Sequence, residues 1–257
     1  MDKTSGEIFL RKIHEEIISS SQQNKLPWPL LSQVNEEYLG YLRNTEGNFY
    51  YQWLAHLVRI KKPNLVLELG NGLGLSTLMM LSELSEKARL VSCDLIKQLD
   101  FIPPHIFNDT RLKLYFGNDL NLNIFGDNLP VGIDMLFIDS EHTFKHISAE
   151  WEIYKNLCNR GAIVILDDIR MHDMFTFWES LPYPKLELTE KCHFSGFGFF
   201  LYTSDSSPNS QNAYREALQY VFEQHDLLKD EQIKRDNLPV SLIRKKIANR
   251  LSFLTRR

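Results

Sequence analysis

LVLELGNGLGLST, residues 65–77, is the stretch that decides the fold. It begins with an apolar run as long as a buried strand, and it continues into a turn with three glycines and the start of a helical pattern. Gly70, Gly72 and Gly74 let the chain turn sharply out of the strand, and they let a ligand approach the backbone amides at the N-terminus of the next helix. The alternative is an ordinary turn between a strand and a helix, without a ligand.

The same alternation of strand and helix continues along the chain. Further apolar runs of strand length lie at residues 89–94, 112–117, 133–139 and 162–168. Continuous Val, Ile and Leu runs separated by helical patterns are typical of parallel strands that are buried on both faces. Residues 185–202 contain two extended runs without a helix between them, which predicts an antiparallel pair at the sheet edge. We therefore expect an α/β protein with a doubly wound, mostly parallel sheet.

Composition and length fit one α/β domain with extensions. The chain has 257 residues, of which 43% are hydrophobic and 24% charged, and this usage excludes disordered and fibrous classes. We expect N-terminal helices over residues 1–60 as a lid on the acceptor side, a core over 61–203, and a C-terminal helical extension over 204–257. No linker is long enough to separate a second domain.

Charge is distributed unevenly along the chain. The formal net charge is −4, yet residues 238–257 carry six basic residues and no acidic one. The acidic body argues against a dedicated nucleic-acid binder. VSLIRKKIANRLSFL, residues 240–254, predicts an amphipathic basic helix. We expect it to pack on its own acidic domain or on a second copy in a homodimer, and the alternative is an anionic membrane or nucleic acid.

Cysteine usage and hydropathy bear on location. The three cysteines form no CxxC pair and leave an odd thiol, which is typical of a reducing compartment. Charged residues come before any apolar run long enough for a signal peptide, and no stretch approaches the ~18 apolar residues of a membrane-spanning helix. We expect a cytoplasmic protein.

Two carboxylates accompany the glycine-rich turn. Glu68 precedes the first glycine by two residues, where it can accept a hydrogen bond from an ammonium group, and Asp94 ends the next strand, where it can hold both hydroxyls of a ribose. Nicotinamide dinucleotides and S-adenosylmethionine are both bound in this way. The dinucleotide pattern GxGxxG needs a third glycine where this chain has Leu75, so this chain departs from the dinucleotide pattern and has ExGxGxG instead.

This ExGxGxG segment resembles motif I of the class I S-adenosylmethionine-dependent methyltransferases, whose fold has a seven-stranded sheet. The resemblance implies that Gly70, Asn71, Gly72 and Gly74 lie under the cofactor. It also implies that Glu68 lies near the methionine amino group, that the Ser76 hydroxyl contacts the methionine carboxylate and that Asp94 binds the ribose. In the turn GND after the third strand, Asn118 or Asp119 would contact the adenine side.

A second group of carboxylates follows two later strands. Asp139 ends the strand of FIDSEHTF, residues 137–144, and Asp167 and Asp168 end the strand of ILDDI, residues 165–169. In a parallel sheet these strand ends meet at the edge where ligands bind. Three clustered carboxylates repel one another unless a cation neutralises them, and oxygen ligands suit Mg²⁺, Ca²⁺ or Mn²⁺. The alternative is that Asp139 and Asp168 cap the following helices.

These two segments resemble the metal-binding segments of the divalent-cation-dependent O-methyltransferases, including the catechol and caffeoyl-CoA groups and relatives that act on antibiotic sugars. The resemblance covers about residues 45–202. The catechol and caffeoyl-CoA groups end the second segment in Asp-Asn, whereas this chain has Asp-Asp, as the sugar-modifying relatives do. This departure leaves the class of acceptor open between phenolic and sugar-containing molecules.

His142 stands where the catechol-type enzymes carry a general-base lysine. A neutral imidazole can take a hydroxyl proton near neutral pH. The alternative is an exposed residue in the first turn of the next helix. His142 and His146 have the spacing of a zinc pair, but no ExxH pattern surrounds them, so we do not predict zinc there.

The expected function is therefore O-methylation of a small-molecule hydroxyl by S-adenosylmethionine. A divalent cation, expected to be Mg²⁺, would lie on Asp139, Asp167 and Asp168, with His142 and Asp139 in the catalytic roles. The alternative is a protein of the same fold that binds S-adenosylmethionine without methyl transfer and acts through a partner of its basic C-terminal helix.

Overall fold

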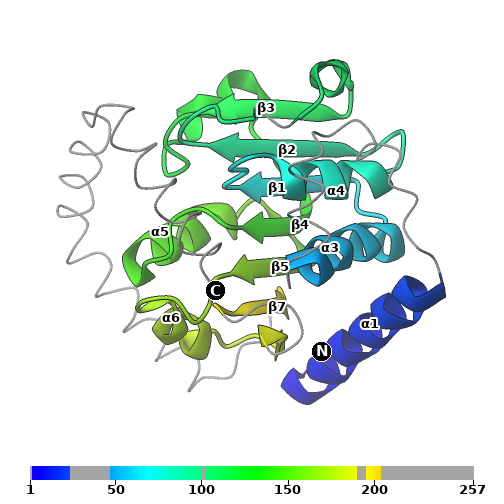
Figure 1. Cartoon of the computed structure of the whole chain (residues 1–257). Coiled ribbons are helices and arrows are strands. Elements are labelled where there is room, and N and C mark those ends of the chain that lie inside the picture. Colours follow the sequence, from blue (N-terminus) through cyan, green and yellow to red (C-terminus); the bar gives the residue numbers. More distant parts are fainter. Residues whose placement is uncertain (1, 24–46, 100–101, 190–194, 204–257) are drawn as a thin grey trace, which may run out of the picture.

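The computed structural model describes residues 2–23, 47–99, 102–189 and 195–203. A single seven-stranded sheet runs through the molecule in the order β3-β2-β1-β4-β5-β7-β6 (Figure 1). Its strands are β1 (Leu65–Leu69), β2 (Arg89–Asp94), β3 (Leu112–Phe116), β4 (Ile133–Ile138), β5 (Cys158–Asp167), β6 (Lys185–Glu187) and β7 (Phe197–Leu201). The helices are α1 (Lys3–Gln23), α3 (Gly47–Lys61), α4 (Leu75–Glu83), α5 (Phe144–Tyr154) and α6 (Met174–Ser180), with short 3₁₀ turns η2 (Pro104–Asn108) and η3 (Leu122–Asn128).

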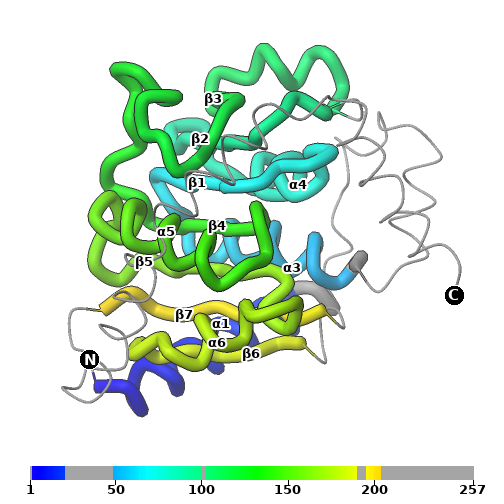
Figure 2. The backbone as a smooth tube through the Cα atoms, turned by 90° about the vertical axis from the view of Figure 1, so that its left-hand side faces the viewer, coloured from blue at the N-terminus to red at the C-terminus, as the bar shows by residue number. Residues whose placement is uncertain are grey.

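The sheet has the topology that the sequence predicts. Strands β3, β2, β1, β4 and β5 pair in parallel, so their carboxyl ends share one edge. Figure 2 views the molecule from the side toward which most of the strand arrows in Figure 1 point. The expected antiparallel pair is confirmed at the other end of the sheet, with one refinement. The strand antiparallel to β5 is β7, and β6 lies outside it at the edge.

Helices cover both faces of the sheet, because alternate residues of each buried strand face opposite sides. Val66, Met135 and Phe137 belong to the core beneath α1, α3 and α4. Their strand neighbours Leu67 and Leu136 belong to the core beneath α5 and α6. The result is a three-layer α/β sandwich in which β1 and β4 are buried from both sides.

Aromatic side chains pack the helices onto the β7 end of the sheet. Trp53 of α3 contacts Phe197 and Phe199 at ring-centroid distances of 5.1 and 4.9 Å. On the other face, Trp151 of α5 meets Phe200 at 5.1 Å. The aromatic residues of β7 are therefore buried on both faces of the sheet.

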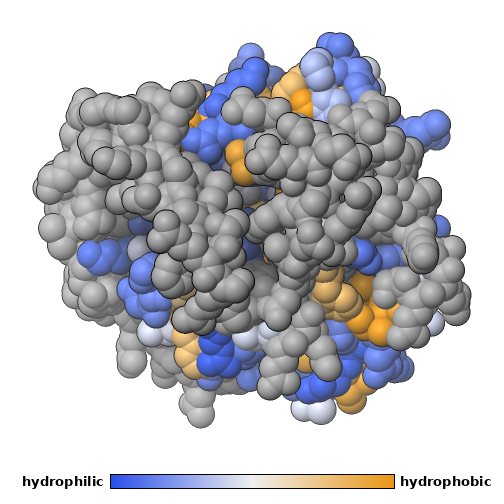
Figure 3. Space-filling view, viewed as in Figure 1, coloured by the Kyte–Doolittle hydropathy of each residue, from blue (hydrophilic) through white to orange (hydrophobic). Residues whose placement is uncertain are grey.

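Several predictions fall on residues outside the described ranges. They include the C-terminal helical extension over 204–257, its basic helix at 240–254 and the helical pattern at 213–228. Figure 3 shows one face of the molecule. On its described part, hydrophilic residues predominate, and hydrophobic residues form separate small areas. Among the described helices, none combines the length and the apolar character needed to cross a membrane.

Candidate active site

The glycine-rich turn between β1 and α4 passes directly beneath the end of β4. Gly70 has φ +85°, and a Cβ atom there would lie 2.1 Å from the backbone oxygen of Asp139, so only glycine fits this crossing. Gly72 has φ +48°, and a Cβ there would meet no atom of the described residues within 4 Å. Among those residues, the turn is therefore closed on the side of β4 and open above Gly72. Gly74 then caps the N-terminus of α4 in the left-handed conformation.

Asp94, the last residue of β2, fastens this turn. Its Oδ2 accepts hydrogen bonds from the backbone amides of Asn71 at 3.0 Å and Gly72 at 2.8 Å. Burial raises the pKa of Asp94, and these amide donors act against that rise. The Asn71 side chain donates to Ser92 at 3.0 Å, but its Oδ1 has no hydrogen-bond partner among the residues that the structure describes.

Glu68 lies below the turn and is completely buried. Its two oxygens accept hydrogen bonds from the hydroxyls of Ser76 and Thr77, both at 2.5 Å. Burial raises the pKa of Glu68 to about 7, although the hydroxyl donors lower it. Glu68 thus joins the end of β1 to the first turn of α4. Thr77 is a partner that the sequence motif does not indicate.

The GND turn after β3 carries the two residues expected on the adenine side. Oδ1 of Asn118 accepts from the backbone amide of Leu120 at 2.9 Å, which shapes the turn. The carboxylate of Asp119 points to α5, where it lies 3.1 Å from Nε2 of His146. Tyr154 of α5 donates its hydroxyl hydrogen to the backbone oxygen of Asp119 at 2.6 Å.

Asp139, Asp167 and Asp168 come together where β4 and β5 end. The parallel register pairs Ile138 of β4 with Leu166 of β5. The next residues along the two strands, Asp139 and Asp167, are therefore neighbours. Burial, and then the charges of Asp167 and Asp168, raise the pKa of Asp139 well above its usual range, although 31% of its side chain is exposed. Asp168 has φ +53°, a conformation that aspartate tolerates better than most residues.

His142 completes this acidic centre, which we define as Asp139, Asp167, Asp168 and His142. Its Nε2 lies 3.2 Å from Oδ2 of Asp168 and 3.7 Å from Oδ1 of Asp139. The alternative of an exposed residue in a helix is wrong, because α5 begins at Phe144 and the His142 side chain is only 8% exposed.

The alternative of simple helix caps does not fit either. Thr143 caps α5 by accepting from the amide of His146, and Asp173 accepts from the amide of Phe144 at 2.8 Å. Asp139 takes no part in this cap. Asp173 thus has a structural role at the start of α5.

Tyr50 of α3 approaches the acidic centre from the opposite side. It is buried and stacks edge-on against Phe197 at 5.0 Å. Burial, and then the charges of Asp167 and Asp139, raise the pKa of Tyr50 well above its usual range. The helix before the glycine-rich turn therefore supplies an aromatic hydroxyl to the neighbourhood of the carboxylates.

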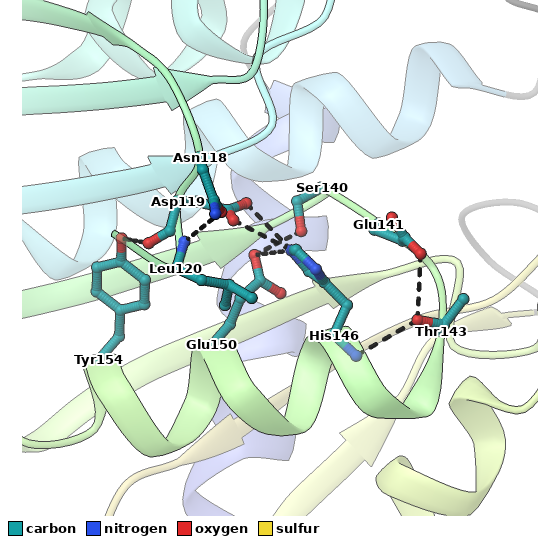
Figure 4. A network of polar contacts seen from close by, with 9 residues as sticks. All are labelled: Asn118, Asp119, Leu120, Ser140, Glu141, Thr143, His146, Glu150 and Tyr154. Atoms are coloured by element: carbon teal, nitrogen blue, oxygen red, sulfur yellow. Dashed lines mark hydrogen bonds and ion pairs between the residues drawn. The ribbon is translucent and has the colours of Figure 1, made fainter. Parts of the chain in front are cut away.

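A second polar group, which the sequence reasoning missed, lies behind the GND turn (Figure 4). We call Asp119, His146 and Glu150 the histidine cluster. Nε2 of His146 lies 3.1 Å from Asp119 and 3.6 Å from Glu150, and Glu150 is fully buried. Burial alone would lower the pKa of His146, but the charges of Glu150 and Asp119 raise it to about 10. His142 and His146 therefore belong to different groups, and they do not form a pair.

Comparison with known proteins agrees with this architecture. Residues 67–169 match the family model described as a methyltransferase domain, a range that includes the glycine-rich turn and the whole acidic centre. One curated relative, an uncharacterized protein of Acanthamoeba polyphaga mimivirus, is 38% identical over 64 residues. That stretch spans 25% of this chain and 28% of the relative.

Solved structures with the same fold include a methyltransferase from Geobacter sulfurreducens, with TM-score 0.54 and 21% identity over 73% of this chain and 96% of that one. The O-methyltransferase TomG from Streptomyces achromogenes, in complex with S-adenosylmethionine, has TM-score 0.55 and 18% identity over 74% and 96% of the chains. An O-methyltransferase from Bacillus cereus, in complex with S-adenosylhomocysteine, has TM-score 0.52 and 20% identity over 74% and 98%. Residues 67–169 thus match a methyltransferase domain, and the chain has the same fold as these solved methyltransferases.

Proposed function

We propose that the chain is an S-adenosylmethionine-dependent O-methyltransferase that acts, with a divalent cation, on a hydroxyl of a phenolic or sugar-containing small molecule. The observation that supports this most is the contact between the glycine-rich turn and the acidic centre, because Gly70 lies directly against the backbone of Asp139. A methyl donor above the turn and a hydroxyl at the carboxylates would be neighbours. Direct displacement requires such an arrangement.

S-adenosylmethionine would lie over the turn formed by Gly70, Asn71, Gly72 and Gly74. The space above Gly72 supports this, because no atom of residues 2–23, 47–99, 102–189 or 195–203 lies within 4 Å of a Cβ placed there. Asp94 would accept from the ribose hydroxyls through the oxygen that does not hold the turn. The cofactor supplies an activated methyl group as a sulfonium.

The two ends of the cofactor would contact different residues. Ser76 would turn its hydroxyl from Glu68 toward the methionine carboxylate, and Glu68 would face the amino group. On the adenine side Asn118 and Asp119 stay the candidates, and Asn118 is favoured because the Asp119 carboxylate is engaged by His146.

The acidic centre fits a hard divalent cation such as Mg²⁺. Asp139, Asp167 and Asp168 offer only carboxylate oxygens. Burial raises the pKa of Asp139, the charges of Asp167 and Asp168 raise it further, and a cation would relieve this repulsion. When bound, the ion would lower the pKa of an acceptor hydroxyl.

The protein's own part in the chemistry falls to His142. Asp168 holds the imidazole by its Nε2, and the same atom faces Asp139. An imidazole between carboxylates can take the proton of the acceptor hydroxyl and keep it as the methyl group moves. Tyr50 and the N-terminal helices would line the acceptor side.

Isothermal titration with S-adenosylhomocysteine tests the cofactor site. We expect binding that Asp94→Ala abolishes and that a control at an exposed aspartate, Asp127→Ala, leaves unchanged. Tight binding of a nicotinamide dinucleotide instead would overturn the cofactor assignment.

Methyl transfer from labelled S-adenosylmethionine to a panel of phenols and sugars tests the rest. We expect activity that a chelator removes and Mg²⁺ restores. Turnover that is insensitive to chelator would remove the metal from the proposal, and unchanged turnover in His142→Ala would remove the base.

A further inference from the structure

The histidine cluster lies apart from the acidic centre. His146 and Glu150 have no part in the proposed methyl transfer, whereas Asp119 also stays a candidate on the adenine side of the cofactor. Asp119 comes from the loop after β3, and His146 and Glu150 lie one turn apart on α5. Their ligand atoms all lie within 4.8 Å of one another. Figure 4 shows the three side chains converging on a common point between the loop and the helix.

Hydrogen bonding among the three residues leaves part of the cluster without a partner. Nε2 of His146 lies 3.1 Å from one oxygen of Asp119 and 3.3 Å from the other, so its single N–H is directed to the Asp119 carboxylate. Its distance to Oε1 of Glu150 is 3.6 Å, which is too long for a hydrogen bond. Oε2 of Glu150 is buried and has no hydrogen-bond partner within the described ranges. A buried carboxylate oxygen in that condition is costly.

The surrounding residues hold each member of the cluster in position. Ser140 donates its hydroxyl hydrogen to Oε1 of Glu150 at 2.5 Å. Tyr154 fixes the backbone of Asp119, and Thr143 fixes the helix start that carries His146. Hydrogen bonds that orient carboxylate and imidazole ligands from outside are a common feature of metal sites.

We propose that Asp119, His146 and Glu150 bind a divalent transition-metal ion, of the class of Zn²⁺, Mn²⁺ or Co²⁺. One imidazole and two carboxylates suit this class better than Mg²⁺, which prefers oxygen ligands alone. Ligand atoms about 2.1 Å from a tetrahedral or octahedral ion lie about 3.0–3.4 Å from one another. The distances of 3.1 and 3.6 Å from Nε2 to the two carboxylates are close to that range.

An ion at this position could be bound by both oxygens of Glu150. Its Oε2, which has no hydrogen-bond partner within the described ranges, would then have one in the ion. The ion would tie the loop after β3 to α5 and so brace the GND turn from behind. Its role is structural, and it is distinct from the cation proposed at the acidic centre.

The test uses the full chain stripped of metal and a variant that lacks the other proposed cation site, Asp139→Asn with Asp168→Asn. In this variant we expect one equivalent of Co²⁺ to bind, with visible absorption bands and a rise in Tm. Adding His146→Gln or Glu150→Gln should weaken the affinity for Co²⁺ at least 100-fold.

The competing state is an imidazolium held between two carboxylates without any metal. It predicts no Co²⁺ bands and no change in Tm in the double variant, and this result would overturn the proposal. Co²⁺ binding that is unchanged by His146→Gln and Glu150→Gln would overturn it as well. Because the readout is metal binding, loss of the histidine cluster is distinguishable from failure of the proposed methyl transfer.

Discussion

The acidic centre and the histidine cluster are both groups of carboxylates with one buried histidine, yet they are assembled differently. Asp139 and Asp167 each directly follow one member of a residue pair between β4 and β5. The register of these two strands therefore brings the two aspartates together. His146 and Glu150 meet Asp119 only because one face of α5 packs against the loop after β3. Register can be inferred from apolar runs, whereas the contact of a helix face with a distant loop depends on tertiary packing.

The largest expected effect is on the rate of methyl transfer, which should depend on the acidic centre far more than on the histidine cluster. Asp139→Ala should lower the rate of methyl transfer by about 1000-fold, because it removes a ligand of the proposed cation and a carboxylate that faces His142. His146→Gln should lower the rate less than about tenfold. Initial rates with labelled S-adenosylmethionine measure both, and equal losses in the two variants would contradict the division.

The glycine-rich turn gives the next largest effect. Gly70→Ala should lower the free energy of unfolding by about 4 kcal/mol, because the new Cβ would lie 2.1 Å from the Asp139 backbone oxygen at φ +85°. Gly72→Ala should cost only about 1 kcal/mol, since it meets open space, but it should block S-adenosylhomocysteine. Urea unfolding and titration calorimetry measure the two. A Gly72→Ala variant that binds the cofactor product normally would argue against the proposed cofactor position.

The histidine cluster should matter for stability more than for turnover. In the presence of a chelator, His146→Gln should lower the free energy of unfolding by about 3 kcal/mol, because it leaves buried carboxylates without a positive partner. The exposed His105 offers a matched control, and His105→Gln should change the value by less than about 0.5 kcal/mol. Urea unfolding checks both variants, and equal small effects would show that the cluster contributes little.

The smallest effect concerns pH and Glu68. The pKa of Glu68 is about 7 in the folded chain and 4.5 as its ordinary value. Between these two pH values, the folded chain keeps a proton on Glu68 that the unfolded chain has released. The free energy of unfolding should therefore fall as pH rises from about 4.5 to 7. In Glu68→Gln, the fall in the free energy of unfolding over this pH range should be smaller by about 2 kcal/mol. Glu86→Gln, at an exposed glutamate, should leave the pH dependence unchanged. Urea unfolding at pH 5 and pH 8 tests this, and parallel pH dependence in wild type and Glu68→Gln would contradict it.

Much of the fold could be predicted from the sequence. Val, Ile and Leu runs predicted β1 and β2 at the bounds that the structure has, because both strands are buried on two faces. β5 begins at Cys158, earlier than its apolar run at 162, because Ile133 pairs with Cys158 across a local irregularity of the ladder. Polar residues before the run gave no strand signal, since they lie at the exposed start of the strand.

The candidate site could be predicted only in part. The residues of the glycine-rich turn and of the acidic centre directly follow strands. The sequence indicates these residues because it indicates where the strands end. The roles of Thr77 beneath the turn and of Glu150 behind it depend on which side chains meet after packing. A signal for the histidine cluster was nonetheless present, because His146 and Glu150 stand within the apolar stripe of α5, beside the buried Ile147 and Trp151. Two ionisable residues at core positions of one helix face require a partner from elsewhere in the fold.

The most direct test of the account is an anomalous-difference map from crystals grown with S-adenosylhomocysteine and Mn²⁺. We predict the cofactor product over Gly72 with its ribose at Asp94, and a manganese peak among Asp139, Asp167 and Asp168. Cofactor density away from the glycine-rich turn, or an acidic centre without a manganese peak beside bound S-adenosylhomocysteine, would contradict the central claim that these two groups together form the active site.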